Sequence, residues 1–121
     1  MDSTTTLAEL KKLLQEFRDA RDWAQFHDAK NLAEAISIEA GELQELFLWK
    51  DKDAVMEKIK NDSEFRRKVE EELADVVMYA LNFANATEID VAKVVKGKIE
   101  KNDRKYPVEK AKGSAKKYDE L

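Results

Sequence analysis

Apolar residues recur every three or four positions along most of the chain, the spacing that places side chains on one face of an α-helix. Helices are predicted from a Ser/Thr cap in residues 3–6 to about Asp22, and over about 29–48, 53–60, 63–86 and 91–105. The N-cap candidates that precede the later main helices are Asp28, the run 61–63 and Asp90. The pattern therefore predicts four main helices and one short, charged helix.

Composition supports this prediction. The 121 residues include only three Gly and one Pro, and 40% of them are charged beside 43% that are apolar. Such a chain favours long helices with charged outer faces, and its length suits a single domain. We predict an all-α, four-helix-bundle-type fold over residues 1–109 and a basic, flexible tail over 110–121.

The helix predicted over 63–86 is apolar nearly all round between Leu73 and Ala84. A helix of this kind is buried on several sides. One small subunit covers such a helix poorly, so we expect at least a homodimer.

The exceptions on this helix form one polar stripe at steps of three and four: Glu72, Asp75, Tyr79 and Asn82. A similar stripe of acidic residues follows the helix predicted over 29–48: Glu39, Glu42 and Glu45. Residues three apart project from the same helix face, so each of the pairs E-x-x-E and E-x-x-D can hold one cation. Two like charges about 4 Å apart repel by about 4 kcal/mol at an effective dielectric constant of 20. Something positive should therefore lie between them.

The ligand types indicate which cation. The chain has no Cys and one His, and oxygen-only ligands favour a hard cation such as Mg²⁺, with Mn²⁺ as a substitute. Mg²⁺ usually shares its coordination with substrate phosphates, which suits phosphoryl chemistry on a nucleotide. In a chain this charged an acidic pair can also be an ordinary solvated face, and Glu71 offers an alternative register to Glu72.

Other classes of protein fit the sequence less well. The net charge is −4 and basic residues are scattered until the C-terminal third, so no general nucleic-acid surface is expected. The polar start lacks the basic and apolar regions of a signal peptide, and no segment is apolar for long enough to span a membrane. The expected location is the cytoplasm.

Four motifs, taken in order, give the chain a resemblance to the MazG-like, all-α NTP pyrophosphohydrolases, most closely to their dCTP pyrophosphatase branch. The motifs are Arg21-Asp22-Trp23-Ala24-Gln25-Phe26-His27, the run from Ile38 to Lys50, the run from Glu71 to Tyr79, and the run from Lys98 to Pro107. The family's metal motif, E-x-x-E followed by E-x-x-D, maps onto Glu39, Glu42, Glu72 and Asp75.

The resemblance also implies the substrate-binding residues. Trp23 and Trp49 would line the base pocket, Tyr79 would lie by the sugar, and Lys98 and Asn102 would reach the phosphates. His27 and Arg104 join this set, and Lys116 or Lys117 would close over the substrate. Without the resemblance each of these would be core filler, a cap or a solvated helix end.

The implied reaction is Mg²⁺-dependent hydrolysis of dCTP, or a modified dCTP, to dCMP and pyrophosphate, with the four carboxylates or Glu45 as candidates for the general base. The resemblance extends the expected assembly to a homotetramer. Leu14 stands where eukaryotic members carry a base-side histidine, which leaves dUTP or another non-standard nucleotide as an alternative substrate. A non-catalytic helical dimerisation module is the alternative from another class.

Overall fold

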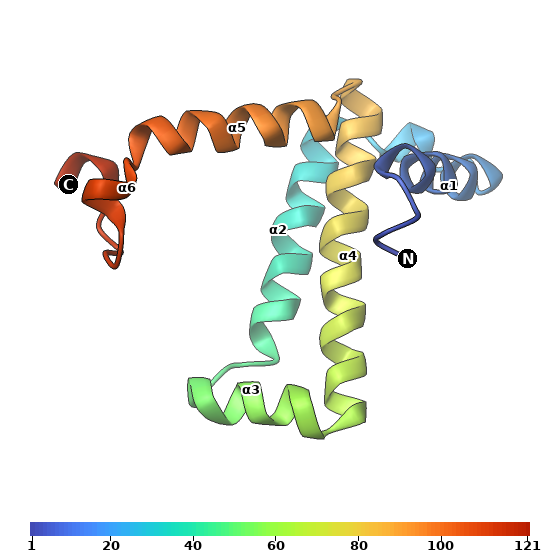
Figure 1. Ribbon diagram of the computed structural model, residues 1–121. Helices are drawn as coiled ribbons and strands as arrows, with labels where there is room; N and C mark the ends of the chain where they lie inside the picture. The colour runs from blue at the N-terminus through green and yellow to red at the C-terminus, as the bar shows by residue number, and fades with distance from the viewer. The chain divides into compact units, whose positions relative to one another are not determined.

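The computed structural model describes all 121 residues, and every regular element is a helix (Figure 1). The chain divides into two compact units, Met1–Glu88 and Ile89–Leu121. The elements of the first unit are α1 (Leu7–Ala20), the 3₁₀ turn η1 (Ala24–Phe26), α2 (Ala29–Glu45), α3 (Lys52–Asn61) and α4 (Ser63–Thr87). Those of the second are α5 (Val91–Lys105), α6 (Val108–Ala111) and the 3₁₀ turn η2 (Tyr118–Glu120).

Side-chain caps set where the helices begin. The Thr6 hydroxyl accepts a hydrogen bond from the Glu9 amide at 3.1 Å, and the Glu9 carboxylate accepts one from the Thr6 amide at 2.6 Å. This capping box satisfies two amides that the first turn of a helix leaves without partners. Asp28, Asp62 and Asp90 cap α2, α4 and α5, which confirms the predicted helix starts there.

The end of α2 differs from the prediction. This helix stops at Glu45 rather than about residue 48, because the next amides bond three residues back: Phe47 to the carbonyl of Gln44 at 3.0 Å, and Leu48 to that of Glu45 at 3.2 Å. Such bonds tighten the chain out of the α-helix. Trp49 follows in the left-handed region at φ 62°.

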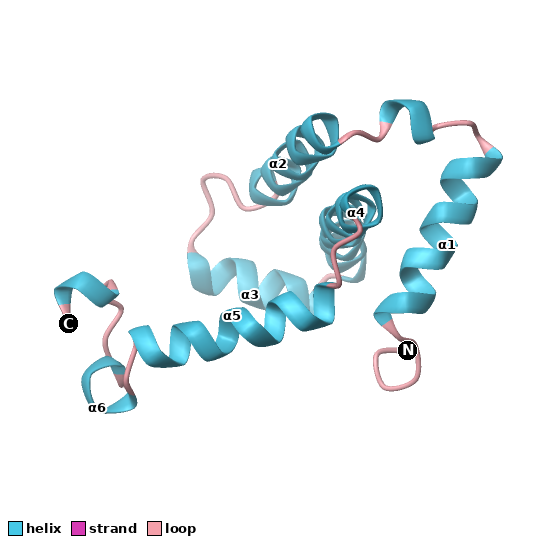
Figure 2. Ribbon diagram, turned by 90° about the horizontal axis from the view of Figure 1, so that it is seen from above, coloured by secondary structure: helices cyan, strands magenta, loops and turns pink.

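In the first unit α2 and α4 lie side by side and run in opposite directions (Figures 1 and 2). The buried apolar residues all belong to this pair: Leu32, Phe65, Leu81 and Ala84. The packing of α1 on α4 includes a hydrogen bond from Asn85 Nδ2 to the Lys11 carbonyl at 3.0 Å. Phe47 meets Phe65 edge to face at 6.3 Å near α3. These contacts fix α2 and α4 as the framework of the unit.

The middle of α4 is more open than the sequence predicts. Leu73 is 51% exposed and Val77 is 42% exposed, although both belong to the stretch that is apolar nearly all round. The contacts of α4 are with α2, α1 and α3, and they leave these two side chains partly open to solvent. A single chain does not supply the predicted burial on several sides.

The second unit gives some structure to the residues expected to form a flexible tail. Tyr118 in η2 meets Tyr106 edge to face at 6.2 Å, and Lys105 Nζ lies 4.6 Å from the Tyr118 ring. These contacts hold the last residues against the end of α5. The division into 1–109 and 110–121 stays a prediction. No helix in either unit has the length and apolarity needed to cross a membrane.

Candidate metal centre and adjoining cavity

The antiparallel pairing of α2 with α4 brings the two acidic stripes together. One carboxylate oxygen from each of Glu39, Glu72 and Asp75 lies within 4.8 Å of the others, and all three side chains are half-buried. We call these three residues the carboxylate triad. The fourth predicted ligand, Glu42, is exposed and lies beside the triad.

Mutual repulsion and burial perturb the triad. A hydrogen bond with Glu42 raises the pKa of Glu39 to about 7, and burial and the charges of Glu42, Asp75 and Glu72 act in the same direction. Burial, followed by the charges of Glu42 and Asp75, raises the pKa of Glu72 as well. The neighbouring carboxylates thus disfavour ionisation of Glu39 and Glu72, and a bound cation would remove that penalty.

The donor set fits a hard divalent cation. Oε2 of Glu39 and Oε2 of Glu72 are buried without any hydrogen-bond partner. Carboxylate oxygens are the ligands that Mg²⁺ and Mn²⁺ prefer. Since buried polar atoms are normally paired, these two oxygens have the chemistry of metal ligands.

The structure distinguishes Glu72, a member of the triad, from Glu71, the alternative residue in the sequence. The Glu71 carboxylate pairs with Arg67 at 2.7 Å on the exposed face of α4. Glu45 is also exposed, and lines an open hollow of about 630 Å³ together with Glu42, Glu72 and three lysines, Lys50, Lys58 and Lys68. Sequence reasoning did not single out these lysines, whose charges have no helical pattern.

A small cavity of about 80 Å³ adjoins the triad through Asp75, which belongs to both. We call it the aromatic cavity. It is lined by side chains from α1, the α1–α2 connection and α4: Leu14, Phe17, Arg18, Trp23, His27, Asp75, Met78, Tyr79 and Asn82. Three of the residues expected to bind substrate lie here, namely Trp23, His27 and Tyr79.

Trp23 is oriented by its neighbours. Its ring meets the Phe17 ring edge to face, with 5.8 Å between the ring centres. The Arg21 guanidinium lies over the Phe17 ring, 3.6 Å from its centre. Arg21 Nη1 also donates to the Phe17 carbonyl at 3.0 Å. Asp22 supports the turn by adopting the left-handed region at φ 53°, which Asp tolerates better than most residues. The motif Arg21-Asp22-Trp23 therefore has a local structural basis.

Sequence reasoning missed Arg18 and Met78 as cavity residues, and noted Asn82 only as part of the polar stripe. A signal for Arg18 was available, because it follows Leu14 by four residues and so shares its helix face. Leu14 lines this cavity as well. The resemblance placed this residue near the base.

The remaining predicted residues do not line this cavity. Trp49 is 94% exposed and borders a separate hollow beyond the end of α2. Lys98, Asn102 and Arg104 are exposed on α5 in the second unit. Their roles, and those of Lys116 and Lys117, stay predictions.

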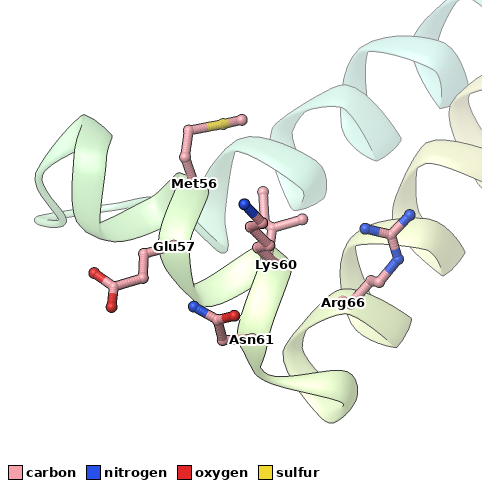
Figure 3. A pocket seen from close by; sticks show the side chains of 6 residues that line it. Met56, Glu57, Lys60, Asn61 and Arg66 are labelled. Atoms are coloured by element: carbon pink, nitrogen blue, oxygen red, sulfur yellow. The ribbon is translucent and has the colours of Figure 1, made fainter.

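A further hollow of about 630 Å³ lies where α3 turns into α4 (Figure 3). Its lining comes from these two helices alone: Met56, Glu57, Ile59, Lys60, Asn61 and Arg66. It contains no member of the triad or of the aromatic cavity, and Arg66 is already paired with Glu70 at 2.7 Å. The chemistry of the site lies elsewhere.

Comparison with known proteins identifies the class to which this fold and site belong. A model of the MazG-like family matches residues 35–121. Proteins named dCTP pyrophosphatase 1 are similar over nearly the whole chain: that of Bos taurus is 39% identical over 119 residues, 98% of this chain and 70% of the relative. The Rattus norvegicus protein is 40% identical over 116 residues, 96% of this chain and 68% of the relative.

Among solved structures, a pyrophosphatase from Archaeoglobus fulgidus is similar with a TM-score of 0.76 and 46% identity, over 83% of this chain and 91% of that one. The chain belongs to the MazG-like family, as its motifs predicted.

Proposed function

We propose that this protein is a Mg²⁺-dependent nucleoside triphosphate pyrophosphohydrolase that converts dCTP, or a modified dCTP, to dCMP and pyrophosphate and so removes unwanted nucleotides from the pool. The observation that carries this proposal is the carboxylate triad, whose Asp75 also lines the aromatic cavity. A cation at the triad and a base in the cavity would belong to one bound nucleotide. The names of relatives about 40% identical support the choice of dCTP.

Glu39, Glu72 and Asp75, with Glu42 beside them, would hold the cation. Bound there, Mg²⁺ supplies charge neutralisation for the triphosphate and a lowered pKa for the attacking water. A carboxylate of this set or Glu45 takes the proton of that water. Because the leaving group carries away negative charge, positive side chains near it would favour its departure.

The substrate is held at its other groups by the residues that the motifs identify. Trp23 offers a flat face to the base in the cavity that it shares with Tyr79 and His27. We further propose that Lys98, Asn102 and Arg104 bind the phosphates, and that Trp49, which lies outside the aromatic cavity, also contacts the base.

A panel of nucleoside triphosphates, assayed for released pyrophosphate with and without Mg²⁺, tests the proposal. We expect Mg²⁺-dependent release with dCTP among the best substrates. The second candidate, the same chemistry on dUTP or another non-standard nucleotide, is favoured by the presence of apolar Leu14 in the cavity. Preference for dUTP would select it.

The alternative of a non-catalytic helical dimerisation module predicts no ligand-linked stabilisation. Thermal unfolding with Mg²⁺ and a non-hydrolysable dCTP analogue separates the two, because a ligand that binds only the native state raises its stability. An unchanged melting temperature would favour the module.

We also propose that the protein is a homodimer or homotetramer. Apolar side chains on α1, α2 and α4 remain more than a third exposed, among them Leu13, Ile38 and Leu73. A second copy would bury them and complete the packing around α4. Light scattering tests this, and a monomeric mass would contradict it.

A further inference from the structure

Three polar side chains around the aromatic cavity have hydrogen-bonding atoms that no protein group engages, and one of these atoms, His27 Nδ1, is fully buried. They come from different parts of the first unit: Arg18 from α1, His27 from the connection before α2, and Asn82 from α4. Their convergence on one cavity indicates that a ligand, rather than the protein, supplies the partners.

Asn82 is the only polar residue among the buried residues of the chain, at 9% exposed. Its side-chain amide makes no hydrogen bond to another protein group. On a helix whose other buried residues are Phe65, Leu81 and Ala84, an apolar residue would pack without this cost. The amide lines a cavity, where water or a polar ligand can supply its hydrogen-bond partners.

The Arg18 guanidinium has hydrogen-bond donors that no protein group accepts. Its side chain is only 18% exposed, and Nε donates to Asp19 at 2.9 Å, which leaves both Nη groups without a protein partner. Arg21, three residues later, covers the Phe17 ring and bonds its carbonyl. The orientation of Trp23 therefore does not require Arg18.

His27 adds a third group. Its Nδ1 is buried without a partner. Burial, and then the positive charge of Arg18, lower the pKa of His27. The neutral ring offers one donor and one acceptor.

We propose that Arg18 and Asn82 are specificity-determining residues that hydrogen-bond to the edge of the substrate base, with Arg18 donating to a carbonyl oxygen of that base. This inference rests on the proposed function, which supplies the nucleotide. A guanidinium can only donate, so its partner must be an acceptor.

The chemistry of these groups selects a class of base. The carbonyl at C2 is common to cytosine, uracil and thymine. Adenine has no carbonyl and offers only ring nitrogens as acceptors, in other positions, so an Arg18 placed to reach the C2 oxygen favours pyrimidines. The Asn82 amide can turn either its oxygen or its NH₂ towards the ligand, and so can pair with a 4-amino or a 4-oxo group. Arg18 thus separates pyrimidines from adenine, while Asn82 accepts either kind of pyrimidine edge.

Steady-state kinetics of Arg18→Met on dCTP and dATP test the proposal, since methionine keeps an unbranched apolar chain and removes every donor. We expect the KM for dCTP to rise about ten- to a hundredfold, the loss typical of a hydrogen bond from a charged donor, while kcat changes much less. The dCTP:dATP ratio of kcat/KM should fall with it. Asn82→Ala should also raise the KM for dCTP.

Lys12→Met is the matched control, because Lys12 is an exposed cation on the same helix that borders a different hollow. It should leave KM and the ratio unchanged. Circular dichroism and melting temperature establish that each variant folds. If Arg18→Met does not fold, Arg18→Lys replaces it: lysine retains the charge without the planar fork, so part of the discrimination should still be lost.

The outcomes that overturn the proposal are distinct. An equal loss on dCTP and dATP would mean that Arg18 acts on the triphosphate, and an unchanged KM would mean that it only stabilises α1. In both cases the wild type still releases pyrophosphate, so the proposed function stands while this inference falls. A wild type that releases no pyrophosphate from any nucleotide overturns both.

Discussion

The carboxylate triad and the aromatic cavity share Asp75 but differ in what they offer a substrate. The triad consists of acidic groups that fit a cation, and the charges around Glu39 and Glu72 contribute to raising the pKa of both. The cavity combines aromatic rings with polar side chains, among them His27, whose buried Nδ1 has no hydrogen-bond partner. A triphosphate with its metal is common to all nucleotides, whereas the base is not. From this comparison we propose that the triad supplies the chemistry and that the cavity selects the substrate.

The largest expected effect comes from neutralising the triad. Glu72→Gln keeps the shape of the side chain and removes one charge, so we expect pyrophosphate release from every nucleotide to fall by about a hundredfold or more. Glu71→Gln is the matched control, since Glu71 is a surface residue paired with Arg67. Equal activity in the two variants would remove Glu72 from the chemistry.

A change on the cavity side should act on binding rather than on rate. Trp23→Leu removes the aromatic face, and we expect KM for dCTP to rise about tenfold, the value of one base–aromatic contact. The exposed neighbour Phe26, which does not line the cavity, provides the control Phe26→Leu. A loss in kcat with unchanged KM would contradict the proposal that the cavity acts on binding and the triad on chemistry.

The smallest effect is a pH dependence of stability in the metal-free protein. Because the pKa of Glu39 is raised to about 7 in the folded state, the native protein binds more protons than the unfolded chain between about pH 4.5 and 7. The stability that this proton provides is full below the unfolded pKa and is lost as pH rises through 7. We expect the melting temperature to fall between pH 5.5 and 8, and Glu39→Gln to flatten the fall.

Added Mg²⁺ should counter this loss at pH 8, where Glu39 is ionised and able to bind the cation. Glu34→Gln, on the same helix at an exposed ion pair with Lys30, should keep the wild-type profile. A Glu39→Gln profile identical to that of the wild type would mean that Glu39 does not titrate as described.

Much of this site could be predicted from local pattern. Helix starts follow from caps such as Asp28 and Asp90, which act within one turn. The stripe from Glu72 to Asn82 follows from helical spacing alone. The predicted family is confirmed by the MazG-like model and by relatives that carry the name dCTP pyrophosphatase 1.

Other features depend on tertiary structure that a single sequence does not specify. The 3₁₀ bonds after Glu45 and the left-handed Trp49 end α2 early, although the apolar pattern continues. Helical spacing places Arg18 on the same face as Leu14, but only the packing of α1 on α4 brings it to the same cavity as Asn82. The open face at Leu73 shows that apolar pattern predicts a need for burial without identifying what covers it.

Binding of Mn²⁺, followed by electron paramagnetic resonance in the wild type and in Asp75→Asn, tests most directly whether the carboxylate triad is a divalent cation centre. We predict saturable binding to the wild type, competition by Mg²⁺, and an affinity at least about tenfold lower in Asp75→Asn, which loses a charged ligand. Equal affinity in the two proteins, or no Mn²⁺ binding to the wild type, would contradict the account.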